Sequence, residues 1–503
     1  MRAQVKEIES VVTPESLAGH LREERGLVLL RSGGAEGDQG RYSFLACRPF
    51  LAFRSSGSVC DLYDEEGRAL SRHFGSPWVV MNELMSRYEL LDQVDLPFPL
   101  GGCFGYWGYD LKDFLEPKLT RRKAPRMEIP DCVAGFYDSL VVFDHGLGRA
   151  WLVTTGLSRD GGRSKEVAIA ASRFWESAIE KASHEEDRPV VTVRGRARRL
   201  QKAMDEALAR RKCLAPKPIP SSDMSRSGFI AATRKAQEFI REGHIYQVNL
   251  SHALTAPCPL DGWALFESMF AVSPAPFAGY LDGGDFRLVS TSPERFLRMS
   301  GSQIESRPIK GTRPRSSDPA RDAQLSFELQ TSPKETAELI MITDLIRNDL
   351  GKVCEYGSVQ TPELMRLERF AQVQHLVSTI RGQLREDVGH FAAFQACFPG
   401  GSITGAPKFR AMEIIDELEP FRRGPYTGCL GYFGFNRESQ LNIVIRTAIL
   451  KNRSALFQVG AGIVADSEPE AEYAETLAKA AGFLAALGLP TAREYPARTP
   501  RRS

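Results

Sequence analysis

Two segments of the chain place pairs of carboxylates at a spacing that could bind a metal ion. In SPKETAELIMITDLIRNDLG, Glu335 and Glu338 are three residues apart, and in DSEPEAEYAETLAKAAG, Glu472 and Glu475 repeat that spacing. Residues three apart share one face of a helix. Most such pairs lie on solvated surfaces, so each pair alone is weak evidence. Four carboxylates facing one another would need a cation between them, and ligands that are all oxygen favour Mg²⁺.

Both segments carry the start signals of a helix. Ser332 is the predicted N-cap of the first helix, and Pro333 follows in the first turn. Ser467 and Glu470 match a capping box at the start of the second. The sequence therefore predicts that both carboxylate pairs are held on helices.

The stretch RPIKGTRPR contains one lysine, Lys310, among three arginines. Pro308 and Gly311 flank it and predict a constrained loop. Taken alone, a lysine in a basic loop is more often a solvated surface residue. A primary amine held rigidly could instead act as a nucleophile.

The stretch FPGGSITGAPK predicts a loop rich in amides and hydroxyls that leads into a helix near Pro407. Such a loop can bind a carboxylate or phosphate at the helix N-terminus. It is not a P-loop, because no glycine directly precedes Lys408 and no Ser or Thr follows it. An ordinary strand-to-helix turn remains an equally good interpretation.

Composition limits the classes of protein that fit. The 503 residues are 42% hydrophobic and 25% charged, which is typical of a soluble globular protein with a large core. A net charge of +2, from 65 basic and 63 acidic residues, argues against a dedicated nucleic-acid binder. Nine cysteines occur singly and predict buried thiols in a reducing cytoplasm. No signal peptide or membrane-length apolar run is present, so we expect a cytoplasmic protein that is not associated with membranes.

Four regions differ in character along the chain. Residues 1–156 are rich in strand patterns, 157–227 form a helical and basic connector, 228–487 mix helices and strands, and 488–503 form a tail that we expect to be disordered. The arginines of the connector could suggest an RNA-binding or partner-binding protein without catalytic activity. No aromatic residues are interleaved with them, which favours a solvated helix face or a linker.

Six motifs occur in order and together resemble one enzyme family. They are TSPERF, RPIKGTRPR, KETAELIMITDLIRNDLG, VQHLVSTIRG, FPGGSITGAPKFRAMEIIDELEP and QVGAGIVADSEPEAEYAET. They resemble the chorismate-utilising enzymes: anthranilate synthase component I, aminodeoxychorismate synthase component I, and the isochorismate and salicylate synthases. The resemblance covers 228–487, and GRYSFLACRPF and GYWGYDL upstream resemble the first two only. It implies an α+β fold with a large β-sandwich core, helices packed outside, and a chorismate site in the cleft.

The resemblance also implies individual roles. Glu294 in SPERF would be the general acid/base near the C4 hydroxyl of chorismate. Glu338 and Glu475 would be magnesium ligands, and Glu335 and Glu472 would bind the metal directly or through water. The substrate-binding residues would be His375, Thr404, Gly405, Tyr432, Arg446, Gly460, Ala461, Gly462 and Lys479.

Lys310 decides between two members of the family. Anthranilate synthases have an alanine there and read PIAGT, whereas PIKGT resembles aminodeoxychorismate synthase component I, in which the lysine is a nucleophile. Lys310 would add at C2 as the C4 hydroxyl leaves. Ammonia would then add at C4, expel the lysine and give 4-amino-4-deoxychorismate, the first step toward p-aminobenzoate and folate. The alternative is anthranilate synthase component I with an unusual lysine, in which ammonia adds directly at C2.

Partners follow from the same resemblance. No glutaminase-type cysteine motif or lyase domain occurs in the sequence, which predicts a separate glutamine amidotransferase subunit that supplies ammonia. A separate pyridoxal-phosphate lyase would complete p-aminobenzoate. LVLLRSGG and SPAPF stand where tryptophan-binding relatives have LLES and an NPSPY-like motif. These departures disfavour feedback inhibition by tryptophan.

Overall fold

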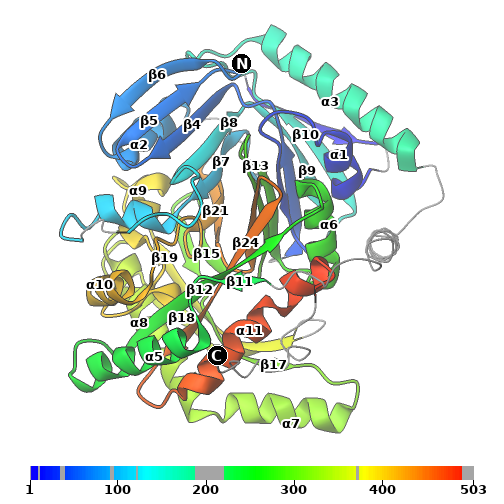
Figure 1. Cartoon of the computed structure of the whole chain (residues 1–503). Helices are drawn as coiled ribbons and strands as arrows, with labels where there is room; N and C mark the ends of the chain where they lie inside the picture. The colour runs from blue at the N-terminus through cyan, green and yellow to red at the C-terminus, as the bar shows by residue number, and fades with distance from the viewer. Residues whose placement is uncertain are drawn as a thin grey trace.

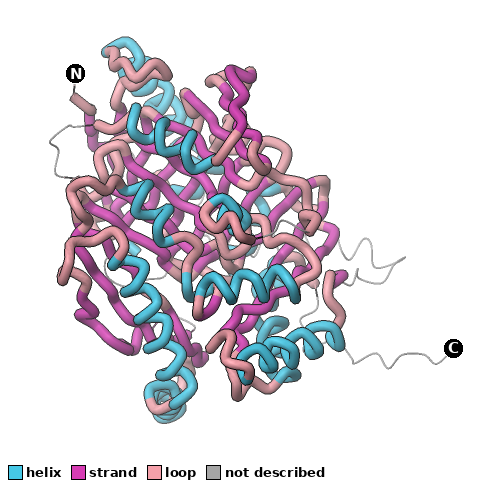
Figure 2. The backbone as a smooth tube through the Cα atoms, turned by 90° about the vertical axis from the view of Figure 1, so that its left-hand side faces the viewer, coloured by secondary structure: helices cyan, strands magenta, loops and turns pink. Residues whose placement is uncertain are grey.

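The computed structural model describes residues 2–9, 12–33, 40–90, 96–119, 123–186, 220–369 and 373–489. Two twelve-stranded antiparallel sheets form the centre, and helices lie around them (Figure 1). Figure 2 shows from a second direction that the helices lie outside the strands. Residues 187–219 of the predicted connector and 490–503 of the predicted tail lie outside the described residues.

The first sheet contains strands from both halves of the chain. Its order is β1 (Gln4–Ile8), β10 (Arg149–Thr154), β9 (Ser139–Asp144), β3 (Tyr42–Ala46), β2 (Val28–Arg31), β13 (Phe277–Asp282), β14 (Arg287–Ser292), β23 (Thr447–Lys451), β24 (Ser454–Ile463), β12 (Gln247–Pro257) and β11 (Ser221–Ser222), with β20 (Gly405–Ala406) also on β12.

The second sheet is built in the same way. Its order is β17 (Ile309–Pro314), β19 (Val373–Gln383), β16 (Gln303–Ser306), β15 (Arg295–Ser300), β22 (Glu438–Ile443), β21 (Cys429–Gly434), β7 (Gly102–Trp107), β8 (Cys132–Tyr137), β4 (Leu51–Ser56), β5 (Val59–Tyr63) and β6 (Ala69–Phe74), with β18 (Gln360–Arg369) also on β19.

The helices connect and cover these strands. They are α1 (Pro14–His20), α2 (Pro77–Arg87), η2 (Tyr109–Phe114), α3 (Lys165–Glu186), α5 (Arg226–Arg241), α6 (Gly262–Val272), α7 (Pro319–Gln330), α8 (Pro333–Gly351), α9 (His390–Cys397), η3 (Gly401–Ile403), α10 (Lys408–Leu418) and α11 (Pro469–Ala486). Among the described helices, none has both the length and the apolar character needed to cross a membrane.

Regions 1–156 and 228–487 share both sheets. In the first sheet β2 pairs with β13, so that Leu29 lies opposite Tyr280. In the second sheet β7 pairs with β21, so that Phe104 lies opposite Tyr432. Within the described residues, both sheets contain strands of both regions, so the two regions form one sandwich.

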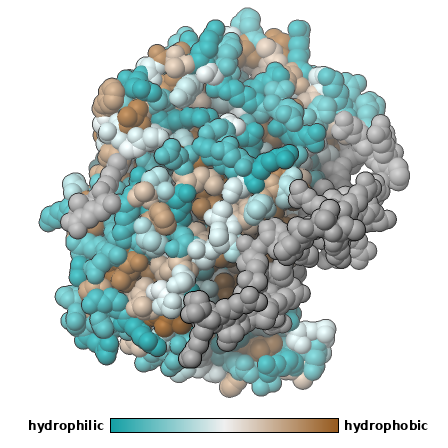
Figure 3. Space-filling model, in the orientation of Figure 1, coloured by the Kyte–Doolittle hydropathy of each residue, from teal (hydrophilic) through white to brown (hydrophobic). Residues whose placement is uncertain are grey.

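Aromatic side chains fill much of the space between the sheets. Phe44 of β3 meets Tyr432 of β21 edge-on, with ring centroids 4.9 Å apart. On the outer face of the second sheet, Trp107 of β7 packs edge-on against Phe433 of β21 at 5.1 Å, and both rings contact Phe394 of α9. All eight cysteines of the described residues are buried thiols. In Figure 3 the visible described surface is mainly hydrophilic, and hydrophobic residues are scattered over it in small groups.

The helix-start signals in the sequence can be compared with the observed starts of α8 and α11. α8 begins as predicted, with Ser332 Oγ accepting the N–H of Glu335 (3.4 Å). The capping box predicted for α11 is wrong: the helix begins at Pro469, and the Ser467 hydroxyl donates instead to the Glu472 carboxylate (2.7 Å).

The loop predicted around Lys310 is also wrong. Lys310 lies on strand β17, which pairs with β19 through a register shift between Lys310 and Thr312. Gly311 sits at that bulge with φ +66°, a backbone conformation that favours glycine. An added Cβ would lie 2.6 Å from Leu329 Cδ1, so both the backbone and the packing require glycine here.

Candidate active site

A cavity of about 440 Å³ lies where β12 and β24 of one sheet face β17 and β19 of the other, beside α8 and α11. Most of the predicted site residues line it. They are Glu294, Lys310, Glu335, Glu338, His375, Arg446, Gly460, Gly462, Glu472, Glu475 and Lys479. Residues that are more than 180 positions apart in the chain therefore meet in one space.

Three predicted binding residues near this cavity do not line it. Thr404 is fully buried, and its hydroxyl donates to the Gly400 carbonyl (3.0 Å). Gly405 pairs through its backbone with Val248 of β12. Ala461 points into the apolar cluster beneath α5 and α10, because alternate residues of a strand face opposite sides of the sheet.

Tyr432 was also predicted to bind the substrate, and it does not line the cavity. Its ring stacks on Phe104 with centroids 5.3 Å apart and belongs to the aromatic core between the sheets. Tyr426 lines the cavity instead, together with Arg446. Tyr426 Oη lies only 2.8 Å from where a Cβ on Gly460 would be, so a side chain at position 460 would collide with it.

Each of the four predicted metal-binding carboxylates faces a cation. The pairs, measured from nitrogen to oxygen, are Lys310–Glu338 at 4.0 Å, Lys334–Glu472 at 3.2 Å, Arg313–Glu335 at 3.5 Å and Lys479–Glu475 at 2.7 Å. Lys334 and Arg313 line the cavity and were not predicted to contribute. The carboxylates are thus compensated by side chains of the protein itself.

The chemistry of this donor set suits a hard divalent cation, because carboxylate oxygens are the ligands that Mg²⁺ prefers. Burial raises the pKa of Glu338, and the negative charges of Glu335 and Glu472 add to that rise, against Lys310 and Lys334. A cation between the carboxylates would relieve the repulsion. Among the described residues, however, no group of three or more His, Cys, Asp or Glu side chains is arranged to hold a metal ion.

Glu294 and Lys310 meet at Ser402. The Ser402 hydroxyl donates to Glu294 Oε1 (2.8 Å), and the Ser402 carbonyl accepts from Lys310 Nζ (3.5 Å). Burial raises the pKa of the Glu294 carboxyl, and the Ser402 hydroxyl and the Lys310 charge partly offset that rise. A buried carboxyl whose pKa is raised keeps its proton to higher pH than a solvated one, which suits a proton donor.

Two further cations, Arg446 and Lys479, line the same cavity. Arg446, at a strained φ of +53°, donates from Nη1 to the carbonyl of Lys479. Lys479 Nζ donates to the Gly460 carbonyl (2.8 Å), and burial lowers the pKa of this lysine. His375 faces the same space and is held at Nδ1 by Thr312 Oγ1 (3.0 Å). A buried guanidinium and ammonium beside glycine backbone are groups that suit a small molecule carrying a carboxylate.

Comparison with known proteins identifies the family. The chorismate binding enzyme family model matches residues 64–485. The chain belongs to this family. Anthranilate synthase component 1 of Acetivibrio thermocellus is 34% identical over 475 residues, covering 94% of this chain and 92% of that protein. Aminodeoxychorismate synthase component 1 of Bacillus subtilis is 33% identical over 452 residues, covering 90% of each.

A solved structure agrees with the fold. The crystal structure of anthranilate synthase component I from Streptococcus pneumoniae superposes with a TM-score of 0.70 at 28% identity, covering 89% of this chain and 92% of that one. The predicted α+β sandwich with outer helices is confirmed. Since relatives with both names occur at similar identity, overall similarity does not choose between the two reactions within the chorismate binding enzyme family.

Proposed function

We propose that this chorismate-binding enzyme aminates chorismate at C4 to give 4-amino-4-deoxychorismate, with Lys310 as a transient nucleophile. The observation that carries the proposal is the position of Lys310. Its amine lies in the cavity beside the Ser402 carbonyl and 4.0 Å from Glu338, and Ser402 links it to Glu294. A primary amine held next to a buried acid can form a covalent bond to the substrate once it has given up its proton.

In the first step, Lys310 Nζ forms a bond to C2 of the substrate as the C4–oxygen bond breaks. Glu294 donates its proton to the departing hydroxyl, which leaves as water. Its raised pKa keeps that proton available until it is needed. The substrate is thereby held as a cationic secondary amine on Lys310.

In the second step, ammonia forms a bond to C4 and the C2–nitrogen bond to Lys310 breaks, which returns the lysine as a neutral amine. The ammonium group formed at C4 gives a proton to the Glu294 carboxylate. Both residues are restored, and the sum of the steps is chorismate plus ammonia giving the amino product plus water. Two allylic displacements leave the nitrogen on the carbon that carried the hydroxyl.

The remaining cavity residues would bind and orient. Arg446, with Tyr426 and the backbone of Gly460 and Gly462, suits the enolpyruvyl carboxylate. Glu335, Glu338, Glu472 and Glu475 would hold Mg²⁺, which would supply positive charge for a second carboxylate of the substrate. Lys334 would then have to release Glu472, because its ammonium group and a metal ion cannot share that oxygen.

The ammonia would come from a glutamine amidotransferase subunit, and a separate lyase would convert the product to p-aminobenzoate, completing a step of folate synthesis. Aminodeoxychorismate synthase component 1 of Bacillus subtilis supports this assignment through its similarity. The second candidate is the anthranilate synthase reaction, which is supported in the same way by 34% identity to anthranilate synthase component 1 of Acetivibrio thermocellus.

The two reactions are separated by their products. The protein is incubated with chorismate, Mg²⁺ and an ammonium salt, and the product is identified by mass and fluorescence with and without an added aminodeoxychorismate lyase. We expect p-aminobenzoate only when the lyase is present. Fluorescent anthranilate formed without the lyase would refute the proposed function.

A further inference from the structure

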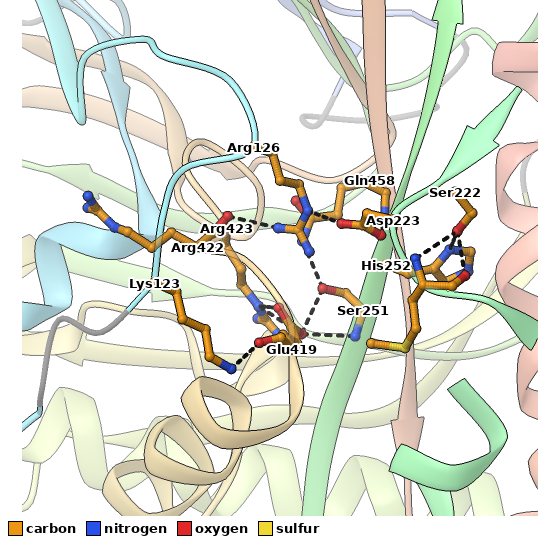
Figure 4. Close-up of polar contacts among 12 residues, drawn as sticks. Lys123, Arg126, Ser222, Asp223, Ser251, His252, Glu419, Arg422, Arg423 and Gln458 are labelled. Carbon is orange, nitrogen blue, oxygen red and sulfur yellow. Dashed lines mark hydrogen bonds and ion pairs between the residues drawn. The ribbon is translucent and has the colours of Figure 1, made fainter. Parts of the chain in front are cut away.

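A buried ion pair behind the cavity, Arg423 with Glu419, uses every donor of its guanidinium group (Figure 4). Both side chains are only 1% exposed. Arg423 Nη2 and Nε bind the Glu419 carboxylate at 2.7 and 3.1 Å. The remaining N–H groups donate to the Asn249 carbonyl (2.6 Å), the Ile403 carbonyl (3.1 Å) and Thr427 Oγ1 (3.0 Å).

Such a pair is a poor device for stability alone. Removing two charges from water costs several kcal/mol per ion, and replacing a buried pair by apolar residues of similar volume is often neutral or stabilising. A guanidinium group supplies a rigid, planar set of hydrogen-bond donors, which an apolar side chain lacks. Its five hydrogen bonds fix the positions of the groups that accept them.

Two of those acceptors belong to walls of the catalytic cavity. Asn249 lies on β12, and Ile403 ends η3; both line the cavity, whereas Arg423 does not. Glu419 holds a second point of β12, because its carboxylate accepts from the N–H and the hydroxyl of Ser251 (2.9 and 2.7 Å). The pair thus ties two walls together from outside the cavity.

Ile403 directly follows Ser402, whose hydroxyl and carbonyl meet Glu294 and Lys310. We propose that Arg423 is a positioning residue: by holding the Ile403 carbonyl it fixes Ser402, and through Ser402 it sets the geometry of the catalytic pair. The identity of that pair rests on the proposed function. The clamp itself rests only on the contacts of Arg423.

The N-terminal region supports the clamp from its outer side. Arg126 pairs with Asp223 and donates from Nη1 to the Arg422 carbonyl (2.8 Å), immediately before Arg423. Lys123 Nζ donates to the Glu417 carbonyl (3.1 Å) and to that of Glu419. Figure 4 shows these side chains converging on the turn that carries Arg423. The turn is therefore held on both sides, and a change at Arg423 cannot be absorbed by moving it freely.

The test replaces the guanidinium while keeping its charge. In Arg423→Lys a single nitrogen cannot reach all the acceptors. We expect kcat for chorismate consumption to fall about 10–100-fold, the cost of a misplaced catalytic group, with KM changed less than about threefold. Amide hydrogen exchange in the 400–406 peptide should become faster, while exchange in α6 stays unchanged. A loss of stability alone would not produce this local pattern.

A second variant separates positioning from stability. Arg423→Met combined with Glu419→Leu removes both charges but leaves the Ile403 carbonyl and the Ser251 N–H without these partners. We therefore expect a smaller fall in Tm than in Arg423→Met alone, which leaves the Glu419 charge unpaired, and the same fall in kcat in both. Arg31→Lys is the matched control. Arg31 Nε lies 2.6 Å from Glu15 Oε1, and this pair does not line the cavity, so the Arg31→Lys variant should keep the wild-type kcat.

The outcomes are decisive in each direction. A folded Arg423 variant with kcat within twofold of the wild type, or unchanged exchange in 400–406, overturns the proposal. If neither variant folds, the pair serves stability and the proposal is also overturned. Chorismate consumption and exchange do not depend on which product forms, so anthranilate as product would refute the proposed function while leaving this test valid.

Discussion

The same two sheets enclose two very different spaces. Where β12 and β24 face β17 and β19, the cavity measures about 440 Å³ and is lined by carboxylates, lysines and arginines. Where β2, β3 and β13 face β21 and β22, only about 20 Å³ remains, because rings such as Phe44 and Phe277 occupy the seam. The sandwich itself does not create a site. The site forms where paired charges keep the sheets from closing on apolar side chains.

The largest effect is expected when the Lys310 amine, which we propose to be the nucleophile, is removed from the cavity. Lys310→Ala should lower chorismate consumption by at least about 10³-fold, as expected when a nucleophile is lost. Intact-mass measurement should show the proposed covalent adduct with chorismate in the wild type and no such adduct in this variant. Lys451→Ala is the control, because Lys451 pairs with Asp285 outside the cavity. An adduct of unchanged mass and yield in Lys310→Ala would contradict the proposal that Lys310 is the nucleophile.

The second prediction concerns the protonation of the cavity. Burial raises the pKa of Glu294, so the acid form persists to higher pH, and the rate should decline as pH rises through that raised pKa. Glu294→Gln should lower kcat by about 10²–10⁴-fold and remove this alkaline decline. Ser402→Ala deletes a hydrogen bond that lowers the pKa, so the decline should move to higher pH. A decline that stays in place in both variants would assign it to another group.

A pair of tyrosines tests the two spaces directly. Tyr426 lines the cavity, whereas Tyr432 packs in the seam with Phe44 and Phe104. Tyr426→Phe should raise the KM for chorismate about tenfold, since one hydrogen bond of about 1 kcal/mol or more is lost. Tyr432→Phe should leave kcat and KM within about twofold. Steady-state kinetics of the two variants would contradict the assignment if Tyr432→Phe had the larger effect.

That exchange of tyrosines shows where sequence reasoning stops. The family resemblance carried by the motifs predicted the α+β sandwich, and Lys310, Glu294 and both carboxylate pairs line one cavity, although the element that holds Lys310 is a strand and not the predicted loop. GYFGF lies in a strand, and nothing in its letters tells which face of the sheet Tyr432 occupies. A one-residue change of register exchanges the two faces.

Other residues were missed because their signals are not local. Lys334 and Arg313 look like ordinary surface cations in the sequence, yet each faces a carboxylate of the cavity. The Arg423 clamp joins positions 249, 403, 419 and 427, and no spacing along the chain announces such a set. The capping box predicted at Ser467 is wrong because the Ser467 hydroxyl donates to the Glu472 carboxylate, a contact that the capping pattern does not include.

The smallest effect is expected at the closed seam. LVLLRSGG (27–34) and SPAPF (273–277), the two segments that differ from the tryptophan-binding relatives, lie side by side at this seam. The Gly33 N–H donates to the Ala275 carbonyl (3.0 Å), and the Ser32 hydroxyl donates to the Pro276 carbonyl (2.9 Å). A space of about 20 Å³ is far below the ~300 Å³ of small-ligand pockets. To bind tryptophan, the sheets would have to separate and break aromatic contacts such as Phe44–Tyr432, a cost that opposes binding. We therefore expect millimolar tryptophan to leave both kcat and Tm unchanged. Inhibition accompanied by a rise in Tm would show that the seam opens.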